Sequence, residues 1–172
     1  QSLAGRPDDA DRTAVEWIKG HPDDAGFRLF LGDRALGTNN LKEAQRHYDR
    51  VIELQPKNAL ALNNLAWVAG KLGRADAVSL AERAVAAAPN QPAFMDTLAM
   101  LLSEKGEHAK ALDLQKKVVA AQPTAPAFKL NLAKIHVAAG DKAAARGLLD
   151  ELAALGDRFP GQAEVTKLKQ GL

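Results

Sequence analysis

Hydrophobic residues recur in this chain at intervals of three and four residues, in runs that end at glycine or proline. Between Ala59 and Lys71 the run has the spacing of one face of a helix, with apolar residues at Leu62, Leu65, Ala66 and Ala69. Gly73 follows, and glycine commonly ends a helix. A second run over 76–88 then stops at Pro89. The pattern predicts two helices joined by a short turn, a helical hairpin.

The hairpin pattern recurs along the chain with a period of 33 or 34 residues. Separations of 34, 33 and 34 residues hold for two sets of positions, the prolines Pro22, Pro56, Pro89 and Pro123 and the leucines Leu31, Leu65, Leu98 and Leu132. The turn between the two helices carries Asn39, Gly73, Gly106 and Gly140. These residue types tolerate the left-handed conformation in which many helices end. Such a period predicts an array of helical repeats.

Small residues occupy two further positions in every repeat. The residue after each repeated leucine is Gly32, Ala66, Ala99 or Ala133. The second helix carries Ala44, Ala77, Ala111 and Ala145. Small residues on both helices allow the helices to approach closely. A bulky substitution there would overpack the contact and destabilise the protein by about 1–3 kcal/mol.

The composition agrees with helices and excludes several classes of function. Hydrophobic residues make up 47% of the chain but aromatic residues only 5%, so alanine and leucine supply most of the apolar surface. A net charge of +2 is too small to hold nucleic acid or an anionic membrane. The absence of cysteine excludes disulfides and thiolate metal sites, and it suits the cytosol as well as an oxidising periplasm.

Residue types that support catalysis or metal binding are scattered along the sequence. The histidines fall in different repeats or at different helical phases, at His21, His47, His108 and His136. None of the serines stands in a nucleophile elbow, and no glycine-rich loop leads into a lysine and hydroxyl pair. Asp23 and Asp24 follow Pro22 at a helix start, where acids act as caps. We therefore expect no catalytic residue, no metal and no cofactor, and a protein that is not an enzyme.

The repeated residues resemble the tetratricopeptide repeat (TPR) family, whose 34-residue motif is W-x2-L-G-x2-Y…A-x3-F…P. The first repeat matches it best, through Leu31, Gly32, Ala44, Tyr48 and Pro56. The tryptophan of the motif is replaced in all four repeats, by Arg28, Leu62, Met95 and Lys129. The resemblance implies an all-α fold, a right-handed TPR superhelix of antiparallel helix hairpins with a C-terminal capping helix.

The register divides a single domain of residues 1–172 into four repeats and two terminal helices. We expect the repeats at 25–58, 59–91, 92–125 and 126–159. A lone helix over 10–19 precedes them, which indicates an array cut or processed at its N-terminus. A polar helix over 162–170 would cover the last hairpin through Val165 and Leu168, as a cap at a natural C-terminus does.

The family resemblance also implies which side chains face a partner, because the first helix of each TPR hairpin lines a concave groove. The candidate partner-binding residues are Phe30, Asp33, Asn63, Asn64, Trp67, Lys71, Asp96, Thr97, Met100, Asn131 and Lys134. The same register adds Leu29, Leu36, Glu104, Leu130 and Val137. Leu29 and Asp33 stand where a carboxylate clamp would require lysine and asparagine, so binding of a chaperone tail is not implied.

Within this set, Asn64 and Asn131 resemble the family asparagines that hydrogen-bond an extended peptide, because an amide donates and accepts at once. For Phe30, Trp67 and Met100 there is an alternative interpretation, core packing between hairpins. Exposure of Trp67 beside Met100 would instead indicate a binding hot spot.

A narrower resemblance connects the chain with the bacterial TPR lipoproteins of exosortase and PEP-CTERM protein sorting. It is carried by residues 62–67 (LNNLAW), 81–84 (AERA), 96–98 (DTL) and the tail that follows Gly161. This resemblance implies a periplasmic adaptor in envelope protein sorting or exopolysaccharide export, anchored by a lipidated cysteine outside these residues. A cytoplasmic location is the alternative.

The leading hypothesis is a non-catalytic scaffold that binds a protein or peptide in the groove, without nucleic acid and without direct insertion into a membrane. The alternative is an oligomerisation or spacer module whose open N-terminal end stacks on another copy.

Overall fold

The computed structural model describes residues 7–172, with side chains described from Arg12 onward. The described residues form helices and no strand. The helices are α1 (Pro7–Gly20), α2 (Ala25–Gly37), α3 (Leu41–Leu54), α4 (Ala59–Lys71), α5 (Ala77–Ala87), α6 (Pro92–Glu104), α7 (His108–Ala121), α8 (Pro126–Ala138), α9 (Lys142–Ala153) and α10 (Gln162–Gln170), with the short 3₁₀ helix η2 (Gly156–Arg158) before the last.

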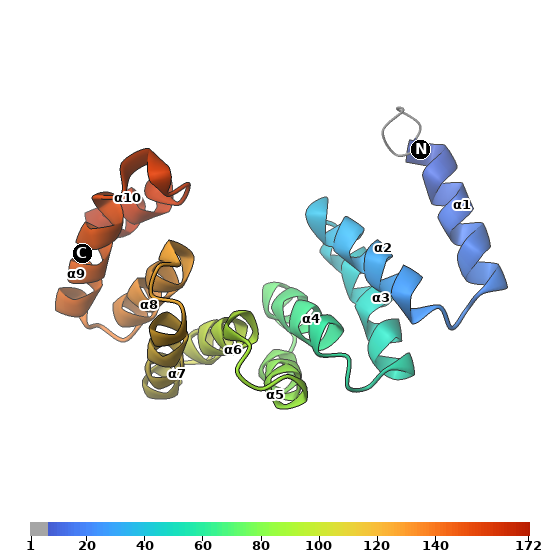
Figure 1. Ribbon diagram of the computed structural model, residues 1–172, viewed down its shortest axis with the longest axis horizontal. Helices are drawn as coiled ribbons and strands as arrows, with labels where there is room; N and C mark the ends of the chain where they lie inside the picture. The colour runs from blue at the N-terminus through green and yellow to red at the C-terminus, as the bar shows by residue number, and fades with distance from the viewer. Residues whose placement is uncertain (1–6) are drawn as a thin grey trace.

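The helices pair in sequence order into four hairpins, α2–α3, α4–α5, α6–α7 and α8–α9 (hairpins 1 to 4), and α10 packs on α9. The hairpins stack into a curved array that is open on one side (Figure 1). The first helices of the hairpins lie along the inner side of the curve, where α6 contacts both α4 and α8. The predicted fold class, an all-α superhelix of antiparallel hairpins, is confirmed.

Turns within the hairpins adopt the left-handed conformation that the sequence predicts. Asn39, Gly73, Gly106 and Gly140 have φ angles of 57°, 69°, 87° and 79°. Asparagine and glycine are the residues with the smallest steric cost at such angles. The turn chemistry therefore fixes where each first helix ends.

Helix starts are held by side chains that accept hydrogen bonds from free backbone amides. Asp24 accepts from the Phe27 amide at 2.8 Å, which confirms its predicted role as a cap. Asn58 caps α4 in the same way, through the Ala61 amide at 3.0 Å. In α6 and α8 a proline begins the helix instead, where its missing N–H leaves no donor unpaired.

Close packing inside the hairpins follows the small residues. A Cβ atom added to Gly32 would lie 2.6 Å from Cε1 of Tyr48, whose side chain is fully buried. The corresponding Ala66, Ala99 and Ala133 are also fully buried. The predicted role of these positions in helix packing is confirmed.

Hairpin 2 departs from the regular pattern at the start of its second helix. The sequence predicts this helix over 76–88, whereas α5 spans 11 residues against 14 in α3 and α7. Asp76 makes no capping hydrogen bond, because its carboxylate pairs with Arg74 at 2.6 Å. Ala77 follows Gly73 by four positions, whereas Ala44 follows Asn39 by five and Ala111 follows Gly106 by five, so this repeat is one residue shorter just before α5.

The two ends of the array differ. At the C-terminal end α10 buries Val165 completely, and Lys169 pairs with Asp150 of α9 at 2.6 Å. Phe159 is buried in the same small core. At the N-terminal end α1 begins at Pro7, three residues before the helix expected over 10–19, and pairs with no other described helix in a hairpin.

Candidate functional site

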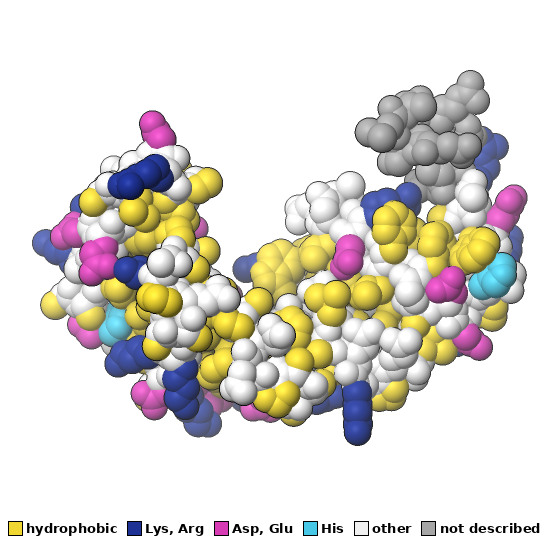
Figure 2. All heavy atoms as spheres, in the orientation of Figure 1, with side chains coloured by type: hydrophobic (Ala, Val, Ile, Leu, Met, Phe, Trp, Pro, Cys, Tyr) yellow, Lys and Arg dark blue, Asp and Glu magenta, His cyan; other side chains and the backbone are white. Residues whose placement is uncertain are grey.

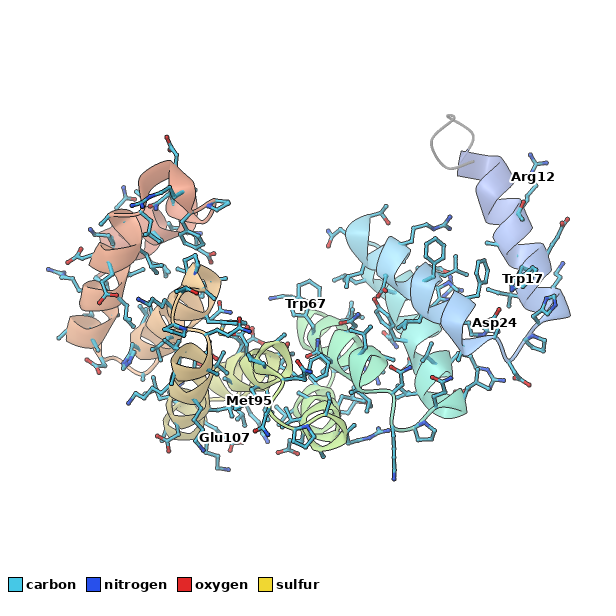
Figure 3. The ribbon with its side chains drawn as sticks, in the orientation of Figure 1. Arg12, Trp17, Asp24, Trp67, Met95 and Glu107 are labelled. Atoms are coloured by element: carbon cyan, nitrogen blue, oxygen red, sulfur yellow. The ribbon has the colours of Figure 1, made fainter. Side chains whose placement is uncertain are left out.

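Two large aromatic side chains lie exposed on the first helices of hairpins 1 and 2. Phe30 of α2 is 57% exposed and Trp67 of α4 is 41% exposed. Neither is a core residue, so the alternative interpretation of these two positions is excluded. Figure 3 shows Trp67 pointing into the open side of the curve. Met100 is half-buried and packs against the main core.

Trp67 borders a hollow that is formed by α4, α6 and α8. Its lining residues are Trp67, Gly70, Lys71, Asp96, Thr97, Met100, Leu101, Glu104, Asn131 and Lys134. Eight of the groove residues expected from the sequence, Glu104 among them, therefore meet in one place. Their helices come from three successive hairpins, so a ligand in this hollow would contact all three.

A second hollow continues from the first toward α2. It is lined by Leu36, Asn63, Asn64, Trp67 and Thr97. Trp67 and Thr97 belong to both hollows, which makes them parts of one inner groove. Figure 2 shows hydrophobic side chains on this inner surface above α4. Phe30 and Asp33 line neither hollow.

The groove combines apolar side chains with a few charged ones. The Lys71 ammonium lies 5.5 Å from the ring centre of Trp67, in a cation–π contact. Across the hollow, Lys134 pairs with Glu164 of α10 at 2.9 Å, so the capping helix also touches the groove. Such a surface offers an aromatic anchor with charged groups beside it, which suits recognition of a polypeptide.

Asn64 takes part in a hydrogen-bonded bridge between hairpins 1 and 2. Its amide donates to the Asp33 carboxylate at 3.1 Å, and the Tyr48 hydroxyl donates to the same carboxylate oxygen at 2.7 Å. Burial and Asp33 raise the pKa of Tyr48, which keeps the hydroxyl protonated as a donor. The side-chain N–H of Asn64 is therefore engaged within the protein.

Asn131 takes part in a second bridge, between hairpins 3 and 4, whose acceptor Asp96 comes from a different position of the repeat than Asp33. Its amide donates to both oxygens of Asp96, at 3.0 and 2.9 Å, and Gln115 donates to Asp96 at 2.5 Å and to the Phe128 carbonyl at 3.1 Å. Burial raises the pKa of Asp96, against the opposing effects of the Asn131 and Gln115 hydrogen bonds and the Lys134 charge.

These two bridges are absent from the sequence interpretation, which treats Asn64 and Asn131 only as peptide ligands. The sequence contains a signal for these bridges. Tyr48 and Gln115 are polar residues that stand four positions after the small residue of the second helix, and the structure shows that this position is fully buried. A polar side chain at a core position needs a partner.

The structure also differs from the sequence interpretation at two apolar residues. Leu130, expected in the groove, is 5% exposed and packs with Leu149 and Leu152 in the C-terminal core. Leu60, which the sequence interpretation omits, is 45% exposed on α4. Since it lies four residues before Asn64 and seven before Trp67, it extends the same face of α4.

A second aromatic surface lies at the N-terminal end, away from the hollows. Trp17 stacks on His21 with ring centres 4.1 Å apart, and its indole N–H donates to Asp24 at 3.0 Å. Phe27 meets the edge of Trp17 and stacks on Phe30. Trp17 nevertheless remains 45% exposed.

The inner groove has the chemistry of a binding surface. Among the side chains that the structure describes, from Arg12 onward, no group of three or more histidine, aspartate or glutamate residues is placed to hold a metal ion. Among the described helices, none is both long and apolar enough to cross a membrane.

Comparison with known proteins places the chain in a family. Two family profiles, both described as tetratricopeptide repeat, match it, one over residues 31–92 and 73–126 and the other over residues 102–170. No curated protein sequence matches the chain significantly.

Among solved structures, residues 41 to the end of MamA from Desulfovibrio magneticus RS-1 superpose with a TM-score of 0.77 at 21% identity, covering 91% of this chain and 89% of that one. PilW, a type IV pilus biogenesis factor, has a TM-score of 0.77 at 19% identity, with 94% and 78% covered. The first TPR of Spaghetti, bound to the HSP90 peptide SRMEEVD, has a TM-score of 0.62 at 20% identity, with 67% and 93% covered. These structures share the hairpin array, and with the matches along the sequence they show that the chain belongs to the tetratricopeptide repeat family.

Proposed function

We propose that this protein is a non-catalytic scaffold that binds a protein or peptide partner in its inner groove. The observation that carries the proposal is the exposed Trp67 ring, which lies in a hollow shared by three successive hairpins. Aromatic rings are scarce in this chain, and an exposed one costs solubility unless it serves contact with another molecule. Large aromatics in a concave surface are the residues that dominate binding energies.

The polar groups around Trp67 favour a polypeptide as the partner. The Thr97 hydroxyl oxygen can accept a hydrogen bond beside the ring, while Lys71 and Glu104 offer one charge of each sign. A polypeptide presents apolar side chains, backbone amides and both charges along its length. A solved relative of the fold holds the peptide SRMEEVD, which supports this class of ligand.

The proposal extends to the compartment. We assign the chain to the bacterial periplasm, as a lipid-anchored adaptor in envelope protein sorting or exopolysaccharide export. The support is the resemblance of residues 62–67, 81–84 and 96–98 to the TPR lipoproteins of the exosortase system.

The experiment is affinity capture from bacterial envelope and cytosolic extracts with the wild-type chain, Trp67→Ala and Trp17→Ala. The two variants remove the same side chain from two different exposed sites, so Trp17→Ala is a matched control. Circular dichroism verifies that all three are equally helical. Loss of an envelope protein with Trp67→Ala alone supports the groove and the compartment together. Equal recovery by all three would refute the groove as the binding site.

A second candidate function, self-association through the N-terminal end, is favoured by the position of Trp17. This residue precedes Pro22 by five, as Val51, Ala84 and Val118 precede the later prolines. Those three side chains are fully buried, whereas Trp17 is 45% exposed. Sedimentation equilibrium tests this candidate: a dimer that dissociates in Trp17→Ala supports it, and a monomer at all concentrations removes it.

A further inference from the structure

Neighbouring hairpins at both ends of the array are joined by polar contacts. Hairpins 1 and 2 share the Asn64–Asp33 bridge, an Arg74–Asp49 ion pair at 3.3 Å, and a hydrogen bond from Arg83 to the Pro56 carbonyl at 3.3 Å. Hairpins 3 and 4 share the Asn131–Asp96 bridge, and Gln115 also donates to the Phe128 carbonyl.

The contact between hairpins 2 and 3, called here the central joint, has no such bond. Among the described residues, no side-chain hydrogen bond or ion pair connects α4 or α5 with α6 or α7. Glu82 and Lys110 attract one another across the joint without forming an ion pair. The joint is held by apolar packing, which brings Leu101 close enough to Gly70 that an added Cβ atom would lie 2.5 Å from it. Apolar contacts are non-directional, so they resist sliding and tilting less than hydrogen bonds do.

The reason lies in the residues at the positions that form the bridges elsewhere. Thr97 stands in the place of Asn64 and Asn131, and its hydroxyl donates to the Ala93 carbonyl of its own helix at 3.1 Å. Ala81 stands in the place of Tyr48 and Gln115 and has no polar group.

Asn63 stands in the place of Asp96, and Trp67 stands in the place of Asp33, so hairpin 2 has a carboxylate at neither acceptor position. Asp96 receives amide donors from both neighbouring helices. The side-chain oxygen of Asn63 is buried without any hydrogen-bond partner. A buried acceptor without a donor costs free energy. The Gln115 oxygen is also unpaired at the contact between hairpins 3 and 4, but the Asn131–Asp96 bridge offsets that cost, whereas no side-chain hydrogen bond among the described residues offsets it across the central joint.

We propose that the solenoid bends at the central joint, with hairpins 1 and 2 moving as one body and hairpins 3 and 4 as the other. Trp67 lies on one side of this joint, and Thr97, Met100 and Asn131 lie on the other, all lining the same hollow. Bending therefore changes the width of the groove and exposes the Asn63 oxygen to a backbone N–H of a ligand. The role of the ligand rests on the proposed function, but the bending itself does not.

The chain is well suited to a direct test, because it contains no cysteine and pairs of spin labels can be attached at introduced cysteines. Arg46, Ser79, Asp113 and Gly147 occupy the same exposed position on the four outer helices. Pulsed electron paramagnetic resonance on the pairs 46–79, 79–113 and 113–147 compares the three contacts between hairpins. We expect the 79–113 distance distribution to be the broadest. Equal widths for all three pairs would overturn the proposal.

A pair of variants at one position sharpens the test. Thr97→Asn supplies the amide donor that Asn63 lacks, whereas Thr97→Val has nearly the shape of threonine and supplies none. One added hydrogen bond is expected to reduce the population of bent conformers about fivefold, which corresponds to about 1 kcal/mol. The 79–113 distribution should narrow in Thr97→Asn and stay broad in Thr97→Val. The same narrowing in both variants, or in neither, would contradict the bridge argument. The measurement uses the free protein, so its failure would leave the groove proposal intact.

Discussion

Replacement of Gly32 by alanine tests the packing of the hairpins most sharply. The added methyl group would lie 2.6, 2.8 and 3.0 Å from Cε1, Cδ1 and Cζ of Tyr48, against the 3.5–4.0 Å of a normal carbon contact. The Tyr48 ring is fully buried and its hydroxyl is hydrogen-bonded to Asp33, so it cannot move freely. Overpacking of this kind costs about 1–3 kcal/mol.

An opposing effect reduces the expected loss. Alanine is favoured over glycine within a helix by about 0.8–1 kcal/mol, so we expect Gly32→Ala to destabilise the protein by a net of up to about 2 kcal/mol. For a chain of this length that lowers Tm by up to roughly 8 °C. Gly147→Ala is the matched control, because Gly147 lies within α9 and no atom would lie within 4 Å of its added Cβ. This control should raise Tm by about 2–4 °C.

The sign of the effect depends on Tyr48. In hairpin 4 an alanine at the same position, Ala133, faces Leu149 without conflict, and both are fully buried. Gly32→Ala should therefore become neutral or stabilising in a Tyr48→Leu background. Thermal melts of the wild type, both single variants and the double variant form the cycle. An equal loss in both backgrounds would refute the contact between Gly32 and Tyr48 as the cause.

Three further predictions concern the turns, the buried carboxylate and the groove tryptophan. Gly106→Ala should lower stability by about 1–2 kcal/mol in thermal melts, because φ is 87° there, and no loss would contradict a strained left-handed turn. The pKa of Asp96 is raised, so the folded protein keeps the Asp96 proton to a higher pH than the unfolded chain does. The contribution of Asp96 to the stability of the folded state therefore falls as the pH rises from its unfolded pKa through its folded pKa. The Tm of Asp96→Asn relative to wild type should thus increase as the pH rises from below the ordinary aspartate pKa toward neutrality, and a constant difference would refute the shift. In Trp17→Phe, Trp67 is the only tryptophan, and its exposed ring should show emission typical of a water-exposed indole; blue-shifted emission would place it in the core.

The sequence predicts the hairpins because their signals are local. Gly73 marks the end of α4, and the apolar spacing within α4 gives its inner and outer faces, so both can be found within one repeat. The exposure of each side chain, by contrast, depends on residues outside its own repeat. Asp33, Trp67, Met100 and Lys134 share one position in the register, yet they differ in exposure, because burial depends on the size of residues in the next hairpin.

The polar bridges could not be predicted for a related reason. Asp96 meets Gln115 and Asn131, which are 19 and 35 residues away, and the bridge requires all three at once. The wrong assignment of Leu130 to the groove has the same origin, since Phe159 and the C-terminal core cover that face only in the last hairpin. The position of a residue in the repeat predicts which way its side chain points. It does not predict which residue that side chain contacts, because the contacting residue can lie in another repeat.

The central claim, that the inner groove binds a polypeptide, is tested most directly with peptides selected from a random display library on the wild-type protein. Their affinities are then measured for wild type, Trp67→Ala and Trp17→Ala. Truncation of a hot-spot residue costs at least about 2 kcal/mol of binding free energy, so Trp67→Ala should weaken binding roughly 30-fold or more. The affinity of Trp17→Ala should stay close to that of the wild type. Peptides that bind Trp67→Ala as tightly as wild type, or that lose affinity only in Trp17→Ala, would contradict the assignment of the groove.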